Sequence, residues 1–349
     1  MKAQTVRFNR DKRSDFLSDL KKRIDAHFAD NHTTQYANAA MYFKIGFWVA
    51  AWAATYALIF CGFSGWATFL LALLHGFTHL FIAFNISHDA NHGAISKSTK
   101  VNKWLSYSLD LIGVNSYLWN YSHNIAHHSY VNLEGVDTSI QGYGIIRFSS
   151  ESPWKPMYKY QHIYAVLIYA LATLNFVTTK DFLLFIHMQR YYKQKPPLSE
   201  WVKMFFFKAF YYTYVFVIPI MFLPYSVGMI LLTFVIAHAF VGFMLALTFQ
   251  TGHLVEETSF PEIDAEGNVD KNWAVHIVET TGDYAYNNAF VNWMFGGINI
   301  HVIHHLLPRI CHIHYTEVAP IVAATAKEYG LTYRQIPTFS AAVSSHFNY

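Results

Sequence analysis

The chain has 349 residues, of which 53% are hydrophobic and only 13% are charged, about half the charged fraction of an ordinary soluble domain. The net charge is +3, and the basic residues are not interleaved with aromatic residues along a soluble face, which excludes a nucleic-acid groove. The two cysteines, Cys61 and Cys311, are too few and too far apart for a disulfide framework or a CxxC metal site. The shortage of charge instead indicates a protein embedded in a lipid bilayer.

The amino-terminal segment, residues 1–39, is polar and has no apolar core of the kind that marks a cleavable signal peptide. Its first basic residues are Lys2, Arg7, Arg10, Lys12 and Arg13. Apolar side chains then recur at helical spacing, at Phe16, Leu17, Leu20, Ile24 and Phe28. This pattern predicts an amphipathic helix. Two positions remain open for it: on the membrane surface, or packed on the protein's own polar part.

Two long windows lack Asp, Glu, Lys and Arg, one from Ile45 to Ser87 and one from Ala209 to Val255. Each holds two spans, because one span needs about 20 apolar residues. The windows break near Gly62 and at Pro224. The predicted spans are about 42–62, 66–86, 205–223 and 226–248. Both turns lack Lys and Arg, whereas the amino terminus and the long loops are rich in them, so the positive-inside rule puts the termini on the cytoplasmic side.

One further apolar stretch, Ile163 to Val177, is short, since at 1.5 Å per residue it reaches about 23 Å against a hydrocarbon core of about 30 Å. If it spanned the bilayer, the histidine groups before and after it would lie on opposite sides and could not share a metal site. We therefore predict an interfacial or re-entrant helix. The expected fold is an all-α integral membrane protein, a single domain over 1–349 with four transmembrane helices. Its cytoplasmic helical cap includes 249–349 and carries the histidine groups.

Three short histidine groups stand just outside the predicted spans on one side. They are His88 and His92; His123, His127 and His128; and His301, His304 and His305. Residues four apart share a helix face, and adjacent residues differ by about 100°, so His127 and His128 could serve two separate ions. Eight imidazoles exceed what one tetrahedral zinc uses, and imidazole suits iron, copper, nickel and zinc alike. Two metal ions are predicted, and ligand type leaves their identity open.

The segments Asn85-Ile-Ser-His-Asp-Ala-Asn-His-Gly93, His123-Asn-Ile-Ala-His-His-Ser-Tyr-Val-Asn132 and Asn299-Ile-His-Val-Ile-His-His-Leu-Leu-Pro-Arg309 resemble the three histidine boxes of the membrane fatty acid desaturase family. Their order and their placement relative to the spans resemble the family too, over about Trp48 to Thr316. The resemblance implies two iron ions, O2 as co-substrate, and a double bond introduced into a long-chain acyl-CoA or acyl-lipid. It also implies an external electron donor, a separate ferredoxin or cytochrome b5 with its reductase.

The family uses a further histidine just after the last span, so the resemblance makes His253 a ninth ligand candidate. Side chains that either orient ligand imidazoles or only solvate a polar surface are Asp89, Asn91, Asp137, Glu256 and Glu257. The third box departs from the front-end branch of the family, where glutamine usually stands in place of His301 and Ile-Glu follows. No His-Pro-Gly-Gly segment of a fused cytochrome b5 occurs either, so the resemblance implies no double-bond position.

Several alternatives stay open. The product could be a hydroxylated chain, as in related di-iron membrane enzymes, and a more remote alternative is a metal transporter, which would bind near the bilayer midplane. His75, His79 and His238 lie inside predicted spans and are either functional or neutral imidazoles bonded between helices. His312 and His314 are interpreted as structural or substrate-adjacent. The basic segments Lys97–Lys103 and Lys180–Lys195 suit either an acidic partner or anionic lipid.

Overall fold

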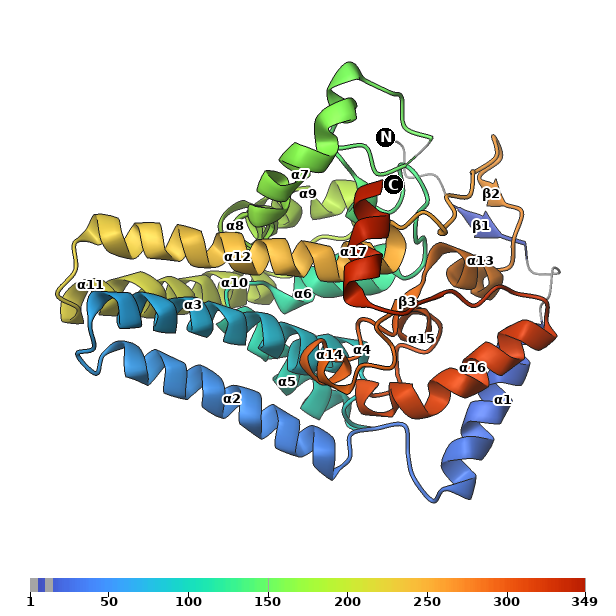
Figure 1. Cartoon of the computed structure of the whole chain (residues 1–349), viewed down its shortest axis with the longest axis horizontal. Helices are drawn as coiled ribbons and strands as arrows, with labels where there is room; N and C mark the ends of the chain where they lie inside the picture. The colour runs from blue at the N-terminus through green and yellow to red at the C-terminus, as the bar shows by residue number, and fades with distance from the viewer. Residues whose placement is uncertain (1–5, 10–14, 150, 349) are drawn as a thin grey trace.

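The computed structural model describes residues 6–9, 15–149 and 151–348, and these are mainly helical (Figure 1). The helices up to the second histidine group are α1 (Asp15–Asp30), α2 (Ala39–Ile59), α3 (Gly65–Ile82), α4 (His88–His92), α5 (Thr99–Leu111) and α6 (Ser116–Trp119). The central helices are α7 (Gln161–Ala170), α8 (Ala172–Asn175), α9 (Asp181–Tyr192), α10 (Leu198–Tyr212), α11 (Ile218–Phe222) and α12 (Val227–His253). The last are α13 (Trp273–Thr280), α14 (Ala289–Met294), α15 (His301–Leu306), α16 (Tyr315–Glu328) and α17 (Phe339–Asn348).

Shorter elements connect these helices. The π-helical turns are η1 (Ala83–Ser87), η2 (Asn120–His127), η5 (Phe176–Lys180) and η6 (Thr213–Val217). The 3-10 turns are η3 (Thr138–Ile140), η4 (Pro156–Tyr160) and η7 (His312–His314). Two parallel pairs of very short strands join distant segments: β1 (Arg7–Phe8) with β2 (Asn268–Val269), and β3 (Asp283–Tyr284) with β4 (Gln335–Ile336).

Four helical stretches are long and apolar enough to cross a membrane, which confirms the four predicted spans. They are Ala39–Ile59, Gly65–His92, Leu198–Phe222 and Val227–His253. Each turn between paired spans ends in a serine cap: Ser64 accepts from the Ala67 N–H, and Ser226 from the Met229 N–H. Figure 1 shows these helices side by side on the left and the shorter helices of the cap gathered at their right-hand ends.

The ambiguous apolar stretch forms a helix that is bent by 45° at a break between Ala170 and Ala172. It packs along α12, where Gly242 lets the backbones approach: an added Cβ would stand 2.7 Å from the Ala170 carbonyl oxygen. His127 precedes this helix and His253 follows it, yet their Nε2 atoms are 3.0 Å apart. Two full spans between these histidines already return the chain to one side. A third crossing would separate them, so this parity favours a re-entrant or interfacial helix.

The amphipathic amino-terminal helix is α1, and its apolar face is covered by the protein's own cap. The fully or nearly fully buried side chains are Phe16, Leu20, Ile24 and Phe28. They pack into one cluster with residues of α13 and α16, such as Val318 and Val322. Arg23 also links α1 to α16, because its guanidinium donates to both carboxylate oxygens of Glu328, at 2.9 and 2.6 Å. Of the basic residues before this helix, Lys2, Arg10, Lys12 and Arg13 lie outside the described residues.

Replacing Leu20 by alanine is expected to lower the free energy of unfolding by about 2–5 kcal/mol, because a fully buried leucine is removed from this cluster. The measurement is the melting temperature of the detergent-solubilised protein. The exposed neighbour Lys21→Ala is the control and should melt like the wild type. Equal melting of the two variants would contradict the packing of α1 on the cap.

Candidate metal centre

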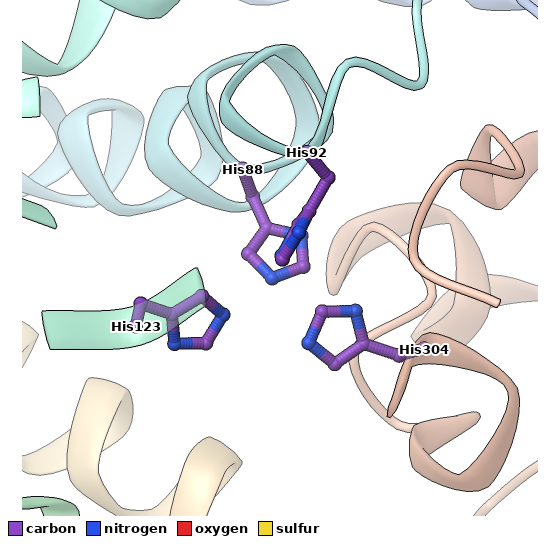
Figure 2. A group of neighbouring side chains, drawn as sticks. All are labelled: His88, His92, His123 and His304. Carbon is purple, nitrogen blue, oxygen red and sulfur yellow. The ribbon is translucent and has the colours of Figure 1, made fainter. Parts of the chain in front are cut away.

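Two groups of four imidazoles meet where the spans join the cap. The first contains His88 and His92 from α4, His123 from η2 and His304 from α15, and its ring nitrogens lie within 4.8 Å of one another. Figure 2 shows the four rings turned toward a common point from three separate segments. His88 is central, with ring centroids 4.4 Å from His304 and 4.8 Å from His92.

The second group contains His127, His253, His301 and His305, again within 4.8 Å. The Nε2 atoms of His253 and His301 are 2.6 Å apart, and those of His301 and His305 are 3.2 Å apart. Ligands at right angles around one ion, at metal–nitrogen distances of about 2.1 Å, stand about 3 Å from each other. The nitrogen spacing therefore suits shared coordination of one ion.

His128 lies between the groups. It comes within 4.8 Å of His304 and His305, its ring stacks on His305 at 4.1 Å, and its Nε2 is 3.2 Å from that of His123. The π turn η2 produces this arrangement, because it bonds the His128 N–H to the His123 carbonyl five residues earlier. The adjacent His127 turns to the second group instead. All nine histidines singled out from the sequence are thus gathered in one place.

Burial disfavours the charged form of several of these rings. It holds the pKa of His123, His128, His304 and His305 well below the usual value and lowers that of His301 to about 3. A neutral imidazole offers the free lone pair that a metal needs. Among the residues that the structure describes, neither ring nitrogen of His88 or His304 has a hydrogen-bond partner. Such a buried unpaired group costs about 1–3 kcal/mol, which coordination would offset, so the donor set fits a metal centre.

Neighbouring acceptors orient two of the rings. Both carboxylate oxygens of Asp137 lie 3.1–3.2 Å from Nδ1 of His127, and Asp137 is fully buried. Its backbone partners, the N–H groups of Asn132 and Ser139, hold it in place. Nδ1 of His301 is 2.8 Å from the Ile298 carbonyl oxygen. Such contacts leave Nε2 for the metal.

Asp89 faces a different neighbour. Its Oδ2 accepts from the backbone N–H and Nδ1 of His312, at 3.0 and 2.8 Å, while its Oδ1 is 3.7 Å from Nδ1 of His88, beyond hydrogen-bond distance. Asp89, Cys311 and His312 lie within 4.8 Å of one another. However, the buried Lys44 ammonium is 2.9 Å from the other ring nitrogen of His312 and already supplies a cation there. His312 thus has a structural role.

Three of the sequence candidates do not reach the rings. The side-chain amide of Asn91 turns back to the Ser87 carbonyl at 2.8 Å. Glu256 and Glu257 are exposed beyond the end of α12. Glu256 and Glu257 were candidates because they are close to His253 in sequence, but the end of the helix directs their side chains outward. His314 also lies apart, with Nε2 2.9 Å from the Tyr36 carbonyl oxygen.

Comparison with known proteins agrees with this geometry. The model of the family described as "Fatty acid desaturase" matches residues 64–337. The chain belongs to the fatty acid desaturase family. It is 33% identical to the sn-1 linoleoyl-lipid 6-desaturase of Synechocystis sp., over 99% of this chain and 97% of that protein. The enzyme of the same description from Arthrospira platensis is also 33% identical, over 96% and 91%. An acyl-lipid (8-3)-desaturase of Physcomitrium patens is 31% identical, over 99% and 73%.

The protein is therefore an oxidoreductase that introduces double bonds into fatty acyl chains, and it is a membrane protein. Desaturases of this family are generally iron-dependent, and the histidine clusters provide ligands of the appropriate type. The metal-transporter alternative is thereby excluded as the main function. The similarity to named desaturases also favours desaturation over the alternative of a hydroxylase.

A glycine that the sequence analysis missed shapes the centre of the desaturase. An added Cβ at Gly252, on α12, would stand 2.6 Å from Cδ2 of His301. Gly252→Ala is therefore expected to displace this ring and to weaken iron binding by roughly 10–100-fold, the usual loss when a ligand is disoriented. The measurement is iron retention against a chelator. Gly228→Ala, on the same helix, is the control, because its nearest neighbour is 3.9 Å away; equal retention in the two variants would contradict the packing role.

An elongated apolar cavity of about 690 Å³ lies between the spans of the desaturase, within the usual range of about 300–1,000 Å³ for ligand pockets. Ser87, His88 and Trp119 line it at the metal centre. It follows one face of α3 and one face of α12 to Trp66 and Tyr225, near the opposite ends of these spans. The metal centre and the cavity are thus continuous.

Proposed function

We propose that this desaturase holds two iron ions in the nine-histidine centre and desaturates acyl chains of membrane lipids, using O2 and electrons from an external donor. The observation that carries the proposal is the junction of buried imidazoles with a long apolar cavity at His88. We assign one ion to His88, His92, His123 and His304 and the other to His127, His253, His301 and His305. His128 stands between them and is available to either.

The reaction requires a strong oxidant at a precise place. An unactivated methylene has no acidic proton, and iron with dioxygen supplies the oxidation. The balance is –CH2–CH2– + O2 + 2e⁻ + 2H⁺ → –CH=CH– + 2H2O. The protein's part is to hold one pair of methylenes against the centre and to exclude water. Trp119 and Phe249, which line the metal end of the cavity, suit this task, and the Trp119 ring stacks on His123 at 4.6 Å.

The cavity supports an acyl-lipid substrate rather than acyl-CoA, because it lies between the spans, where a chain already in the bilayer can enter. The names of the similar proteins from Synechocystis sp. and Physcomitrium patens also specify lipid-bound acyl chains. From Trp66 to His88 the cavity follows 22 residues of helix, about 33 Å. An acyl chain that enters methyl end first can extend over this whole length. Few of its carbons would then remain between the metal centre and the head group. We therefore infer a double bond near the carboxyl end.

The electron donor is proposed to be a separate ferredoxin or a cytochrome b5 with its reductase, which would approach from the side of the cap. By the positive-inside rule this side, with the centre and both termini, is cytoplasmic. The chain 1–349 would act as one domain, because α12, the cap and the segment between the spans each contribute ligands.

The test is a mass analysis of intact lipids from a host that expresses the protein, followed by assay of the purified iron-loaded enzyme with a donor on acyl-lipid and acyl-CoA. We expect lipids that have lost two hydrogens, with the new double bond near the ester. Gain of one oxygen would indicate the hydroxylase instead. Turnover of acyl-CoA alone would contradict the lipid substrate, and failure with every acyl donor would overturn the proposal.

A further inference from the structure

One buried side chain connects the second histidine box to the end of the last span. Asn132 lies in the turn after η2 and is fully buried. Its side-chain amide donates to three backbone carbonyl oxygens, those of His253 at 3.1 Å, Ser259 at 3.3 Å and Thr280 at 3.4 Å. His253 is the last residue of α12 and Thr280 the last residue of α13, and Ser259 lies in the loop between them. The amide therefore joins three segments behind the metal centre.

The nitrogen of this amide, and not its oxygen, must face the three carbonyls. A carbonyl oxygen is an acceptor, so only an N–H group can pair with it. The side-chain oxygen of Asn132 accordingly has no hydrogen-bond partner among the described residues. A carboxylate at this position would place acceptor against acceptor, and an apolar side chain would leave the carbonyls without this donor.

The backbone of Asn132 is constrained as well. Its N–H donates to Oδ2 of Asp137 at 3.0 Å, and the same oxygen is 3.1 Å from Nδ1 of the ligand His127. Its φ is 55°, in the left-handed region that asparagine and aspartate adopt more readily than most other residues with a side chain. Asparagine thus combines a tolerated backbone with the two amide hydrogens that the carbonyls need.

The same contacts orient the ring of His253. The Thr280 carbonyl oxygen accepts from the Asn132 amide and also lies 3.4 Å from Nδ1 of His253. This arrangement leaves Nε2 of His253 for the metal, and that atom is 3.0 Å from Nε2 of His127. Asn132 therefore holds both the backbone of His253 and the acceptor beside its ring. The hydrogen bonds of Asn132 described above reach the surroundings of the second imidazole group alone.

We propose that Asn132 is a positioning residue for the second iron. It holds His127 and His253 at the separation that one ion requires, although these ligands are 126 residues apart in the sequence. The inference rests on the proposed assignment of one iron to each imidazole group. Loss of the Asn132 amide loosens the second iron and leaves the first in place, whereas loss of a residue that only stabilises the fold affects both irons.

The test compares Asn132→Gly with the wild type as purified, iron-loaded protein. Glycine adopts the left-handed backbone without strain, so this change removes the amide and preserves the main chain. The release of iron to a chelator is followed with time, and Mössbauer spectra report the iron environments that remain. We expect one of the two irons to leave faster by roughly 10–100-fold, the usual effect of losing a group that orients a ligand. The other should leave at the wild-type rate.

Asn85→Ala is the matched control. Asn85 is also fully buried, lies on η1 close to His88, and donates from Nδ2 to the Phe81 and Met294 carbonyls at 2.8 and 2.9 Å. Its loss should lower the melting temperature without releasing the iron that Asn132→Gly releases. Asn132→Asp keeps the size of the side chain but donates at most one hydrogen bond. It should release the same iron to a smaller extent, and it replaces Asn132→Gly if that variant does not fold.

Wild-type release of both irons from the variants of Asn132 would overturn the inference and leave the proposed function intact. Faster release of both irons together would also overturn it, as would release of the same iron from Asn85→Ala, because either result would indicate a general loss of stability. If the wild type bound fewer than two irons, the proposed two-iron centre would fail and the inference with it. The iron content of the wild type thus distinguishes the two failures.

Discussion

Replacing His304 by alanine is expected to abolish desaturation and to release iron. His304 belongs to the first imidazole group and also comes within 4.8 Å of His128 and His305, so it lies where the two groups meet. It is fully buried, and neither of its ring nitrogens bonds to another described residue. Its loss removes a ligand outright, so the effect should exceed the roughly 10–100-fold loss that follows removal of a ligand's hydrogen-bond partner.

The measurements are iron per protein and the unsaturated fraction of host lipids. His162→Ala is the control, because His162 is exposed on the first turn of α7, away from the centre. It should keep both iron and activity. Full iron content in His304→Ala would show that this histidine is not a ligand, and loss of iron in both variants would point to general unfolding.

The sequence located the histidine groups because their signal is local. The four-residue spacing of His88 and His92, the charge-free windows and the parity of the spans together put the boxes at one end of the membrane part. The structure agrees with the four spans. The position of the third box in space could not be derived, since His304 and His88 are 216 residues apart and only tertiary packing brings their rings to 4.4 Å.

Two kinds of feature could not be predicted from the sequence. They are contacts made by backbone atoms, and the identity of the element that packs against a given helix face. A carbonyl such as that of Ile298 has no side-chain signal, and nothing in the local pattern shows that Gly252 packs against His301. Periodicity predicted the apolar face of α1 but could not choose between lipid and α16 as its partner. Likewise, Asp137 and Glu257 were equal candidates for orienting a ligand ring. In the structure Asp137 is fully buried, whereas Glu257 is exposed.

Substitution of Ala83 by phenylalanine is expected to separate substrate binding from metal binding. Ala83 begins η1 and lines the cavity, and its carbonyl accepts from the His88 N–H one π turn later. A phenyl ring here would fill the cavity beside the centre without removing a ligand. We expect iron to be retained and desaturation to fall by roughly a hundredfold, because small displacements of reacting atoms have effects of this size. Overpacking should cost about 1–3 kcal/mol of stability.

Ala53→Phe makes the same change on an exposed position of α2 and should leave lipid desaturation unchanged. Iron content, melting temperature and the unsaturated fraction of lipids are compared for the two variants. If Ala83→Phe desaturated lipids at the wild-type rate, the acyl chain would have to reach the irons by another route. If it lost iron as His304→Ala does, the added ring would be acting on η1 and His88 instead of on the cavity. Retained iron with lost activity is the combination expected of an obstructed acyl path.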